Sequence, residues 1–503
     1  MKVCLIAPIT RRRELPRNYP MGLACIAASL REAGHEIEVL DFDINREYES
    51  NTEDCIKKIN ADVVGIGGLI TTYSESKRLT EMVKHYHPET RVLIGGRMAA
   101  SSPELWLEKT PADFIVEGEG EVTAVELLRA LELGEDLVDV KGIWYREGDK
   151  YIRTLPREYI PDLDTLPRPA YDLFEIDRYI SNWENWARGT RPIMMVTCRG
   201  CVVLCSFCYQ GFGGFRQRSV ESFMSEVEFL IGRYGIDTIN FADSTLMVNK
   251  KFVEGFCNEV LRRNLDLKWY CASRVSDLSS KHEDLLRLMK EAGCRRLHFG
   301  VESGSPEILK RIKKGTSVED AERSIHMARR AGLIVHTTFI YGLPGETEKT
   351  AAETASFCRR NLTPVSSMFY ATAYPETELY SEALGKGKIV DEEDFISKLG
   401  DVDQQTINLS DIPDEDFARV KERVERETQI PIIMFLYEYM RRYGVRNMLR
   451  YLHFIWESYP TKEIVGRLTR FLKKSHNTKK IENVSDLSPK EGATTTKDLF
   501  PVS

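Results

Sequence analysis

The first 135 residues alternate short apolar runs with amphipathic segments. "KVCLIAP" (2–8) predicts a buried strand, "MGLACIAASLREAG" (21–34) has the apolar spacing of a helix, and "HEIEVLDFD" (35–43) predicts the next strand. Three further apolar runs repeat this design and break into glycine or small polar residues before the next helix: 61–72, 91–101 and 112–121. Strands that alternate with helices predict a parallel, doubly wound, Rossmann-like α/β domain over residues 1–135.

In such a sheet, ligands bind outside the carboxyl ends of the strands. Glycine at these ends allows close approach of a large ligand, although the same glycines also serve as ordinary turn residues. No G-x-G-x-x-G motif follows the first strand, which disfavours a nicotinamide dinucleotide. The predicted binding face consists of Pro20, Gly22, Asp41, Thr71, Thr72, Gly95, Gly96, Gly118 and Glu119.

A second series of strand–helix units follows a proline-rich stretch. Residues 136–190 read as a small hairpin and then an extended connector. The later units occupy residues 238–264, 268–294, 295–315 and 331–360. Successive units of this length predict a full or partial (β/α) barrel of the TIM type over residues 191–385, with its site at the carboxyl ends of the strands.

The pattern changes again after the barrel. Residues 386–475 predict a helical domain, and its segment 432–460 interleaves aromatic residues with arginines. This segment is either a helical cap that packs on the barrel, or a lid for a large apolar substrate such as a lipid, a polyprenoid or a tetrapyrrole, with a basic face touching a membrane surface. Residues 476–503 are polar and predict a disordered tail.

Composition places the chain among ordinary globular proteins, with 42% hydrophobic and 29% charged residues. A net charge of −7 argues against a nucleic-acid binder. No apolar run is long enough to span a bilayer. The first apolar run precedes the arginines, the reverse of the order in a signal peptide, so we expect a cytoplasmic protein.

Four of the 11 cysteines stand together in "VTCRGCVVLCSFCYQGFGGF" (196–215). Three thiolates from one short loop can hold three irons of a [4Fe-4S] cubane and leave the fourth iron open. A structural zinc site needs four ligands, usually in two pairs, and no second Cys or His pair follows. A reducing compartment disfavours disulfides.

The order Cys201-x-x-x-Cys205-x-x-Cys208, with Phe207 before the last cysteine, resembles the signature of radical S-adenosylmethionine (SAM) enzymes. The runs "PMGLACIAASLREAGHEIEVLD" and "EGEGE" look like the cobalamin-binding domain fused to such enzymes. The resemblance covers roughly residues 1–385. It includes class B methyltransferases and anaerobic Mg-protoporphyrin monomethyl ester cyclases.

The resemblance implies roles for individual residues. Cys201, Cys205 and Cys208 would bind the [4Fe-4S] cluster, and Cys198 would be a neighbour without a ligand role. The implied contacts with SAM are Phe207, Asp243, Arg274, Glu302 and Gly342, and the cobalamin contacts are the binding face named above. Relatives carry a second acid where this chain has Ser244. Because D-x-H-x-x-G is missing, no protein histidine would ligate the cobalt, and His35, His85 and His87 have structural or surface roles.

The chemistry implied by the resemblance is the methylation of an unactivated carbon of a small or apolar substrate through a 5′-deoxyadenosyl radical and methylcobalamin. An external donor such as flavodoxin or ferredoxin would supply electrons, under anaerobic conditions. A radical cyclase with the same cofactors is the alternative within the enzymes. A cobalamin or cluster sensor without turnover is the alternative outside them.

Overall fold

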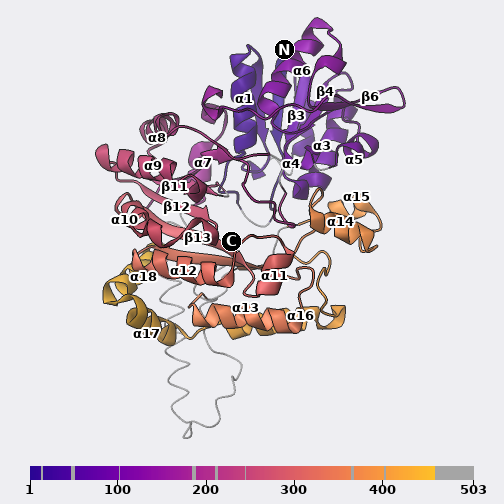
Figure 1. Ribbon diagram of the computed structural model, residues 1–503. Coiled ribbons are helices and arrows are strands. Elements are labelled where there is room, and N and C mark those ends of the chain that lie inside the picture. Colours follow the sequence, from indigo (N-terminus) through magenta and orange to yellow (C-terminus); the bar gives the residue numbers. More distant parts are fainter. Residues whose placement is uncertain are drawn as a thin grey trace. The chain divides into compact units, whose positions relative to one another are not determined.

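The structure is a computed structural model that describes residues 1–12, 15–46, 51–100, 102–183, 189–209, 213–243, 245–363, 367–400 and 404–458. Several predicted stretches lie outside these residues: Ser244, residues 210–212 of the cysteine segment, residues 184–188 of the connector, residues 401–403 and 459–475 of the helical domain, and the tail 476–503. The chain forms two compact units (Figure 1). The first unit comprises residues 1–182, 196–235 and 372–407, and the second comprises 183–195, 236–371 and 408–503. The cysteine loop thus belongs to the first unit, whereas Asp243, Arg274, Glu302 and Gly342 belong to the second.

A seven-stranded sheet in the order β2-β1-β3-β4-β5-β6-β7 forms the centre of the first unit. Its first five strands are parallel, as predicted: β1 (Lys2–Ala7), β2 (Glu36–Asp41), β3 (Val63–Gly67), β4 (Arg91–Gly95) and β5 (Phe114–Val116). Helices cover both faces of this sheet, which confirms the doubly wound fold (Figure 1). They are α1 (Met21–Glu32), α2 (Thr52–Lys57), α3 (Tyr73–Tyr86), α5 (Pro103–Lys109) and α6 (Gly120–Leu133).

The predicted hairpin of the connector extends this same sheet. Strands β6 (Ile143–Glu147) and β7 (Lys150–Arg153) add to β5 in antiparallel register. Without them β5 would be an edge strand with unpaired backbone groups. Ile143 and Trp144 are buried on pairing, so the sheet is larger than the predicted boundary at residue 135 implies.

Residues 154–182 of the connector also belong to the first unit. The amide of Ala170 donates to the carbonyl of Ala24 in α1 at 3.0 Å, and the Tyr171 side chain beside it is 1% exposed. The short helix α7 (Ile176–Ser181) follows and buries Tyr179. The first unit also contains α8 (Val220–Tyr234), α14 (Glu378–Gly385) and α15 (Glu392–Ser397).

The second unit contains a six-stranded parallel sheet in the order β15-β14-β13-β12-β11-β8. Its strands are β8 (Pro192–Met195), β11 (Thr238–Phe241), β12 (Lys268–Ser273), β13 (Cys294–Glu302), β14 (Ile334–Tyr341) and β15 (Ser367–Tyr370). The helices that follow the strands are α9 (Lys250–Arg262), α10 (Glu283–Glu291), α11 (Pro306–Arg311), α12 (Val318–Arg330) and α13 (Glu348–Arg360). This half-barrel confirms the partial barrel predicted from the repeating units.

Apolar side chains on one face of the half-barrel pack against its helices. Phe241 and Trp269 meet Phe256 of α9 edge to face, and Phe339 meets Phe357 of α13 in the same way. Since side chains alternate along a strand, the intervening residues point to the inner face, away from this helix layer.

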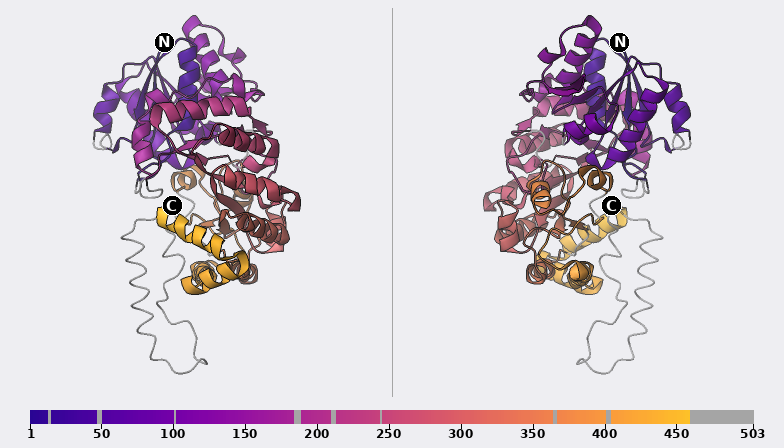
Figure 2. Two further views of the ribbon diagram at one scale, coloured as in Figure 1. Left: turned by 90° about the vertical axis from the view of Figure 1, so that its left-hand side faces the viewer. Right: turned by 90° about the vertical axis from the view of Figure 1, so that its right-hand side faces the viewer.

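Three further helices complete the described part of the second unit: α16 (Asp414–Thr428), α17 (Ile432–Tyr443) and α18 (Val445–Ser458). Helices α17 and α18 lie side by side (Figure 2). Their residues Phe435, Tyr439 and Tyr451 form one core with Ile334, the first residue of β14. The aromatic segment therefore packs on the barrel domain where a strand begins, as the helical-cap interpretation predicts. No helix in the described ranges is both long and apolar enough to cross a bilayer.

Candidate active site

The cysteine segment starts in a small antiparallel ribbon formed by β9 (Cys198–Arg199) and β10 (Arg216–Gln217). Cys198 pairs with Gln217 in this ribbon, and its side chain is buried. Cys201 and Cys205 are half-buried and Cys208 is exposed. The structure thus separates Cys198 from the three cysteines of the motif.

Gly200 allows the chain to turn from the ribbon into the cysteine loop. Its φ is +79°, and a Cβ there would lie 2.2 Å from the carbonyl oxygen of Gly214 and 2.3 Å from that of Gly213. Only glycine fits such a left-handed position against two backbone carbonyls. The next residue along the chain is Cys201, so the turn fixes where the motif begins.

The far side of the cysteine loop is also held by backbone contacts. The carbonyl of Ser206 accepts a hydrogen bond from the amide of Leu379 in α14 at 3.2 Å, and the amide of Cys208 donates to the carbonyl of Cys205 at 3.1 Å. Phe207 is half-buried between these contacts. The thiols remain accessible while the backbone is fixed.

This arrangement fits a cluster better than a single metal ion. Among the described residues, no three His, Cys, Asp or Glu side chains come together around one ion. In a cubane each thiolate binds a different iron, so the three thiols need not converge on one point. Three accessible thiols on a fixed loop, with Cys198 buried apart, therefore fit a [4Fe-4S] cluster with an open iron.

Two arginines of the ribbon bind the acidic residues that follow β5. Arg199 Nη1 lies 2.9 Å from Glu119 Oε1, and Arg199 Nη2 lies 2.5 Å from Glu121 Oε1. Arg216 Nη1 lies 2.7 Å from Glu119 Oε2, which also accepts from the amide of Ile160 at 2.7 Å. Burial alone would raise the pKa of Glu119, but hydrogen bonds from Arg216 and Arg199 hold it below its ordinary value. The sequence alone did not predict this network, because Arg199 and Arg216 lie about 80 and 97 residues from Glu119 along the chain.

The predicted cobalamin residues do lie at the carboxyl ends of the five parallel strands. Gly95 ends β4, Gly96 follows with φ +79°, and a Cβ on Gly96 would lie 3.0 Å from the carbonyl oxygen of Gly68 after β3. Leu69, beside Gly68, is 50% exposed and was missing from the predicted face. Pro20 and Gly22 start α1, Thr71 and Thr72 precede α3, and Gly118 and Glu119 precede α6.

Three of these side chains already have protein partners. Glu119 is bound by the two arginines, and Asp41 accepts a hydrogen bond from the hydroxyl of Tyr179 at 2.7 Å. Burial raises the pKa of Asp41 to about 6. Thr72 Oγ1 donates to the carbonyl of Leu69 at 2.7 Å, a contact within the turn. Backbone groups of this face are therefore better placed for a ligand than these side chains.

The three histidines of the first domain lie away from that edge. His35 stands just before β2 begins, with Nδ1 3.3 Å from the amino terminus. His85 and His87 lie at the end of α3, where His87 Nε2 is 2.7 Å from the carbonyl of Ile56. Both positions agree with the predicted structural roles.

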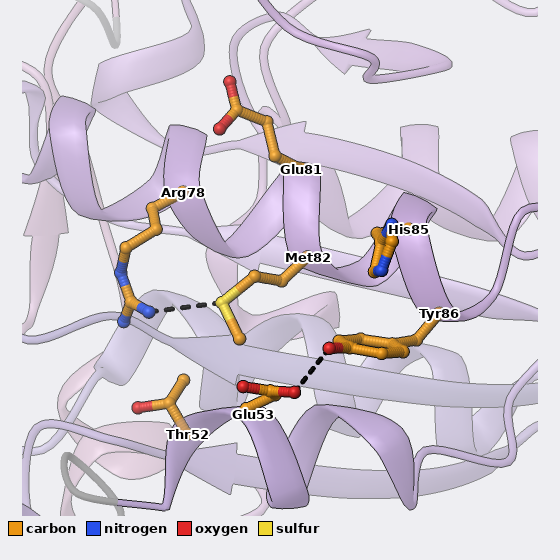
Figure 3. Close-up of a pocket in the computed structure, with 7 residues that line it drawn as sticks. All are labelled: Thr52, Glu53, Arg78, Glu81, Met82, His85 and Tyr86. Atoms are coloured by element: carbon orange, nitrogen blue, oxygen red, sulfur yellow. Dashed lines mark hydrogen bonds between the residues drawn. The ribbon is translucent and has the colours of Figure 1, made fainter.

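A pocket of 560 Å³ lies between α2 and the second half of α3 (Figure 3). Its lining includes Glu53, Arg78 and His85, and the Tyr86 hydroxyl donates to Glu53 at 2.5 Å across it. The lining residues of α3 follow Thr71 and Thr72 by one or more turns of helix, and the others belong to α2, so no residue of the predicted binding face lines this pocket.

In the second unit, Glu302 ends β13 and forms a buried ion pair. Lys314 Nζ donates to Glu302 Oε1 at 2.6 Å, and the two side chains are 9% and 10% exposed. A Cβ on Gly300 would lie 2.4 Å from Glu302 Oε1, so this glycine leaves room for the pair. Lys314 was not predicted; it lies twelve residues away along the chain.

Arg274 lies beside the same group, as its predicted position implies. Its Nη2 donates to the carbonyl of Lys314 at 3.1 Å, and its Nη1 lies 3.8 Å from Asp277 Oδ1. Several buried polar atoms near this point lack a hydrogen-bond partner in the described part of the chain: Arg274 Nε, Asp277 Oδ2, Ser305 Oγ and Thr316 Oγ1. Buried polar atoms normally have partners, so these fit a polar ligand such as the methionyl part of SAM.

Gly342 follows β14 with φ +87° and donates its amide to Glu346 Oε2 at 2.6 Å. Burial raises the pKa of Glu346 to about 8. A Cβ on Gly342 would lie 2.7 Å from Cζ of Phe417 in α16, which gives the glycine a packing role as well. Asp243 is buried just after the end of β11.

The comparisons with known proteins agree with both halves of this description. Residues 195–358 match the Radical SAM superfamily, and residues 16–128 match the B12 binding domain. An uncharacterized methyltransferase of Pyrococcus horikoshii is 32% identical over 398 residues, 78% of this chain and 84% of that protein. The chain belongs to the B12-binding radical SAM enzyme family.

Two further relatives show the breadth of this family. The anaerobic magnesium-protoporphyrin IX monomethyl ester cyclase of Synechocystis is 29% identical over 334 residues, 65% of each chain. The radical SAM methyltransferase TsrM of Kitasatospora setae, solved with tryptophan and a SAM analogue, has the same fold. Its TM-score is 0.63 at 20% identity, over 77% of this chain and 76% of that one.

This chain is therefore a cobalamin-dependent radical SAM enzyme. A [4Fe-4S] cluster, SAM and cobalamin are the cofactors that its family and fold support.

Proposed function

We propose that this enzyme is a methyltransferase that methylates an unactivated carbon of a small or apolar substrate. The main support for this proposal is the similarity to the methyltransferase of Pyrococcus horikoshii. The two proteins are 32% identical, and the alignment covers 84% of that protein and therefore both cofactor domains. When bound, the cofactors supply a 5′-deoxyadenosyl radical that removes a hydrogen and a methylcobalamin that supplies the methyl group.

In this proposal Cys201, Cys205 and Cys208 hold the cluster, and Cys198 does not. Its support is the buried position of Cys198 in the ribbon and the accessibility of the other three thiols. The fixed turn at Gly200 and the backbone contact of Ser206 hold the loop in one conformation. Such fixed ligands cost little reorganisation when the cluster forms.

The second unit binds SAM in this proposal through Glu302 and Arg274. Glu302 accepts hydrogen bonds from the amino group, and Nε of Arg274, which has no hydrogen-bond partner among the described residues, donates to the carboxylate. Lys314 pairs with the Glu302 carboxylate and holds it in place before SAM arrives. Asp243, Phe207 and the backbone at Gly342 complete the proposed set of contacts.

Cobalamin binds in this proposal at the strand ends of the first domain, without a histidine ligand to the cobalt. The small residues Gly95, Gly96 and Gly118 and the exposed Leu69 support a flat, largely apolar ligand there. An external reductant such as flavodoxin or ferredoxin supplies the electrons. We also propose a cytoplasmic, anaerobic setting with peripheral membrane contact, which the exposed Ile433, Met434 and Tyr437 of α17 support.

The experiment is anaerobic reconstitution with hydroxocobalamin, followed by the visible spectrum of the bound corrinoid. Incubation with methyl-deuterated SAM and extracts of small molecules would then reveal a labelled product by mass spectrometry. Bound corrinoid and a product heavier by one labelled methyl group support methyl transfer. If no product carries the labelled methyl group, but a product appears that has lost hydrogen relative to its substrate, the result supports the radical cyclase. The 29% identical cyclase favours this as the second candidate. No turnover at all supports the sensor.

A further inference from the structure

Three neighbouring strands of the half-barrel carry a contiguous polar group, which we call the inner-face cluster: Tyr270, Arg296, His298 and His336. Tyr270 of β12 is the register partner of Arg296 in β13, and His298 is the register partner of His336 in β14. The Arg296 guanidinium lies over the Tyr270 ring at 5.0 Å from its centroid. The two imidazole rings meet edge to face at 5.0 Å.

The cluster points away from the helix layer. Leu297 and Phe299, which alternate with its members along β13, are 0% exposed in the apolar face that the helices cover. Arg296, His298 and His336 are each half-buried. Side chains on the inner face of a partial barrel that retain exposure can meet a ligand.

The charge of the cluster comes from Arg296 alone. Burial and the nearby Arg296 lower the pKa of His298 to about 4, and burial, His298 and Arg296 lower the pKa of His336. Both imidazoles are therefore neutral at pH 7. Within the described ranges no carboxylate forms an ion pair with the Arg296 guanidinium, whose partner is the Tyr270 ring. A half-buried cation without a counter-charge is costly, and an anion would offset that cost.

The Glu302–Lys314 pair lies next to the cluster along β13. After Arg296 and His298 the next inner-face position is Gly300, and a Cβ there would lie 2.4 Å from Glu302 Oε1 and 3.3 Å from Lys314 Nζ. The register with β14 shifts between Gly300 and Glu302, and the Glu302 carboxylate lies over Gly300. On β12 the register partner of His298 is the small residue Ala272. The cluster is therefore adjacent to the carboxylate that is the proposed contact with the amino group of SAM.

We propose that the inner-face cluster binds an anionic group of the substrate, a carboxylate or a phosphate, while the reacting carbon lies toward Glu302. A guanidinium matches the geometry of either oxyanion with two parallel hydrogen bonds. His298, whose Nε2 lies 3.2 Å from Thr338 Oγ1, and His336 lie beside this guanidinium and would report the binding. The inference rests on the proposed function for the position of the reacting end, and it narrows the substrate class to acidic molecules.

The test is a titration of the full-length protein, carrying its oxidised cluster, with inorganic phosphate and separately with acetate. Labelled histidine ring carbons report binding by NMR, and His298→Asn and His336→Asn assign the two signals among the nine histidines. Both signals should shift on saturation with at least one anion. Arg296→Gln should weaken this binding about tenfold or more. Arg295→Gln, at the adjacent bulged position of β13, should bind like the native protein.

Failure of both signals to shift with either anion would overturn the inference, as would equal weakening by Arg296→Gln and Arg295→Gln. Arg296→Lys keeps the charge, so if Arg296→Gln does not fold, a several-fold weaker affinity in Arg296→Lys gives the same answer, and unchanged affinity overturns it. Cleavage of SAM without substrate, measured on the same samples, reports the proposed function separately. If the protein still cleaves SAM but binds neither anion, the result rejects this inference and leaves the proposed function standing.

Discussion

Arg199 Nη1 lies 2.9 Å from Glu119 Oε1, and the Glu119 side chain is only 2% exposed. This pair joins the turn after β5 of the B12 domain to the ribbon that starts the cysteine loop. Glu119 also holds Arg216 at 2.7 Å, so one carboxylate fixes both strands of the ribbon. The conformation of the cysteine loop therefore depends on the B12 domain.

Glu119→Gln should destabilise the protein by about 3 kcal/mol, because it leaves two mostly buried arginines without that charge. Denaturant unfolding monitored by circular dichroism measures the change. Glu135→Gln is the control, since it breaks the exposed pair with Arg129, whose side chain is 66% exposed, and should cost less than about 1 kcal/mol. Equal effects of the two substitutions would contradict a structural role for the buried network.

Gly200→Ala should prevent normal assembly of the cysteine loop, because the new methyl group would collide with the carbonyls of Gly213 and Gly214. Gly134→Ala is a matched control at the end of α6, with a similar φ of +67° but no atom within 4 Å of the new Cβ. We expect the control to cost about 1 kcal/mol and to keep its iron. Iron and sulfide content after reconstitution is the measurement, and a full iron content in Gly200→Ala would refute the steric role.

Glu302→Gln should weaken SAM binding about tenfold or more, because an amide replaces the carboxylate that is paired with Lys314. Glu307→Gln, an exposed carboxylate on α11, should bind SAM normally. Equilibrium dialysis with cluster-loaded protein gives both dissociation constants. If the two variants bind SAM equally well, Glu302 is a structural residue only.

Glu346 should make the protein less stable as pH rises. Burial raises its pKa from an ordinary value of 4.5 to about 8 in the folded chain, so the folded protein holds a proton that the unfolded chain has lost. Stability is then fully present below pH 4.5 and falls as pH approaches 8, by at most about 1.4 kcal/mol per pH unit. In Glu346→Gln, the unfolding free energy measured between pH 5 and pH 8 should no longer fall with this slope. Glu348→Gln, whose side chain is 43% exposed, should retain it. An unchanged slope in Glu346→Gln would show that another group titrates.

The regular parts of the fold followed directly from apolar periodicity. Strands such as β1 and β13 and the half-barrel units were predictable because their patterns are local and repeated. The hairpin β6–β7 was predicted as an element, but its pairing with β5 depends on an edge that no local pattern reveals. The same holds for the site: the cysteine spacing is local, whereas the pairs Glu119–Arg199 and Glu302–Lys314 join residues distant in sequence.

Side-chain partners also change the role that we assign to two predicted contact residues. Asp41 and Glu119 stand at strand ends, where sequence position alone suggests contact with a ligand. The structure gives Asp41 a hydrogen bond from Tyr179 and Glu119 two arginines. Sequence position predicts which edge a residue occupies, but not whether its charge is already satisfied.

Reductive cleavage of SAM tests the central claim most directly. The anaerobically reconstituted protein, its cluster confirmed by iron content, is given SAM and dithionite, and 5′-deoxyadenosine is quantified by mass spectrometry. We predict that the native protein and Cys198→Ala form 5′-deoxyadenosine, whereas Cys201→Ala, Cys205→Ala and Cys208→Ala form none. Cluster-replete native protein that leaves SAM intact, or Cys198→Ala that loses both iron and activity, would contradict this account.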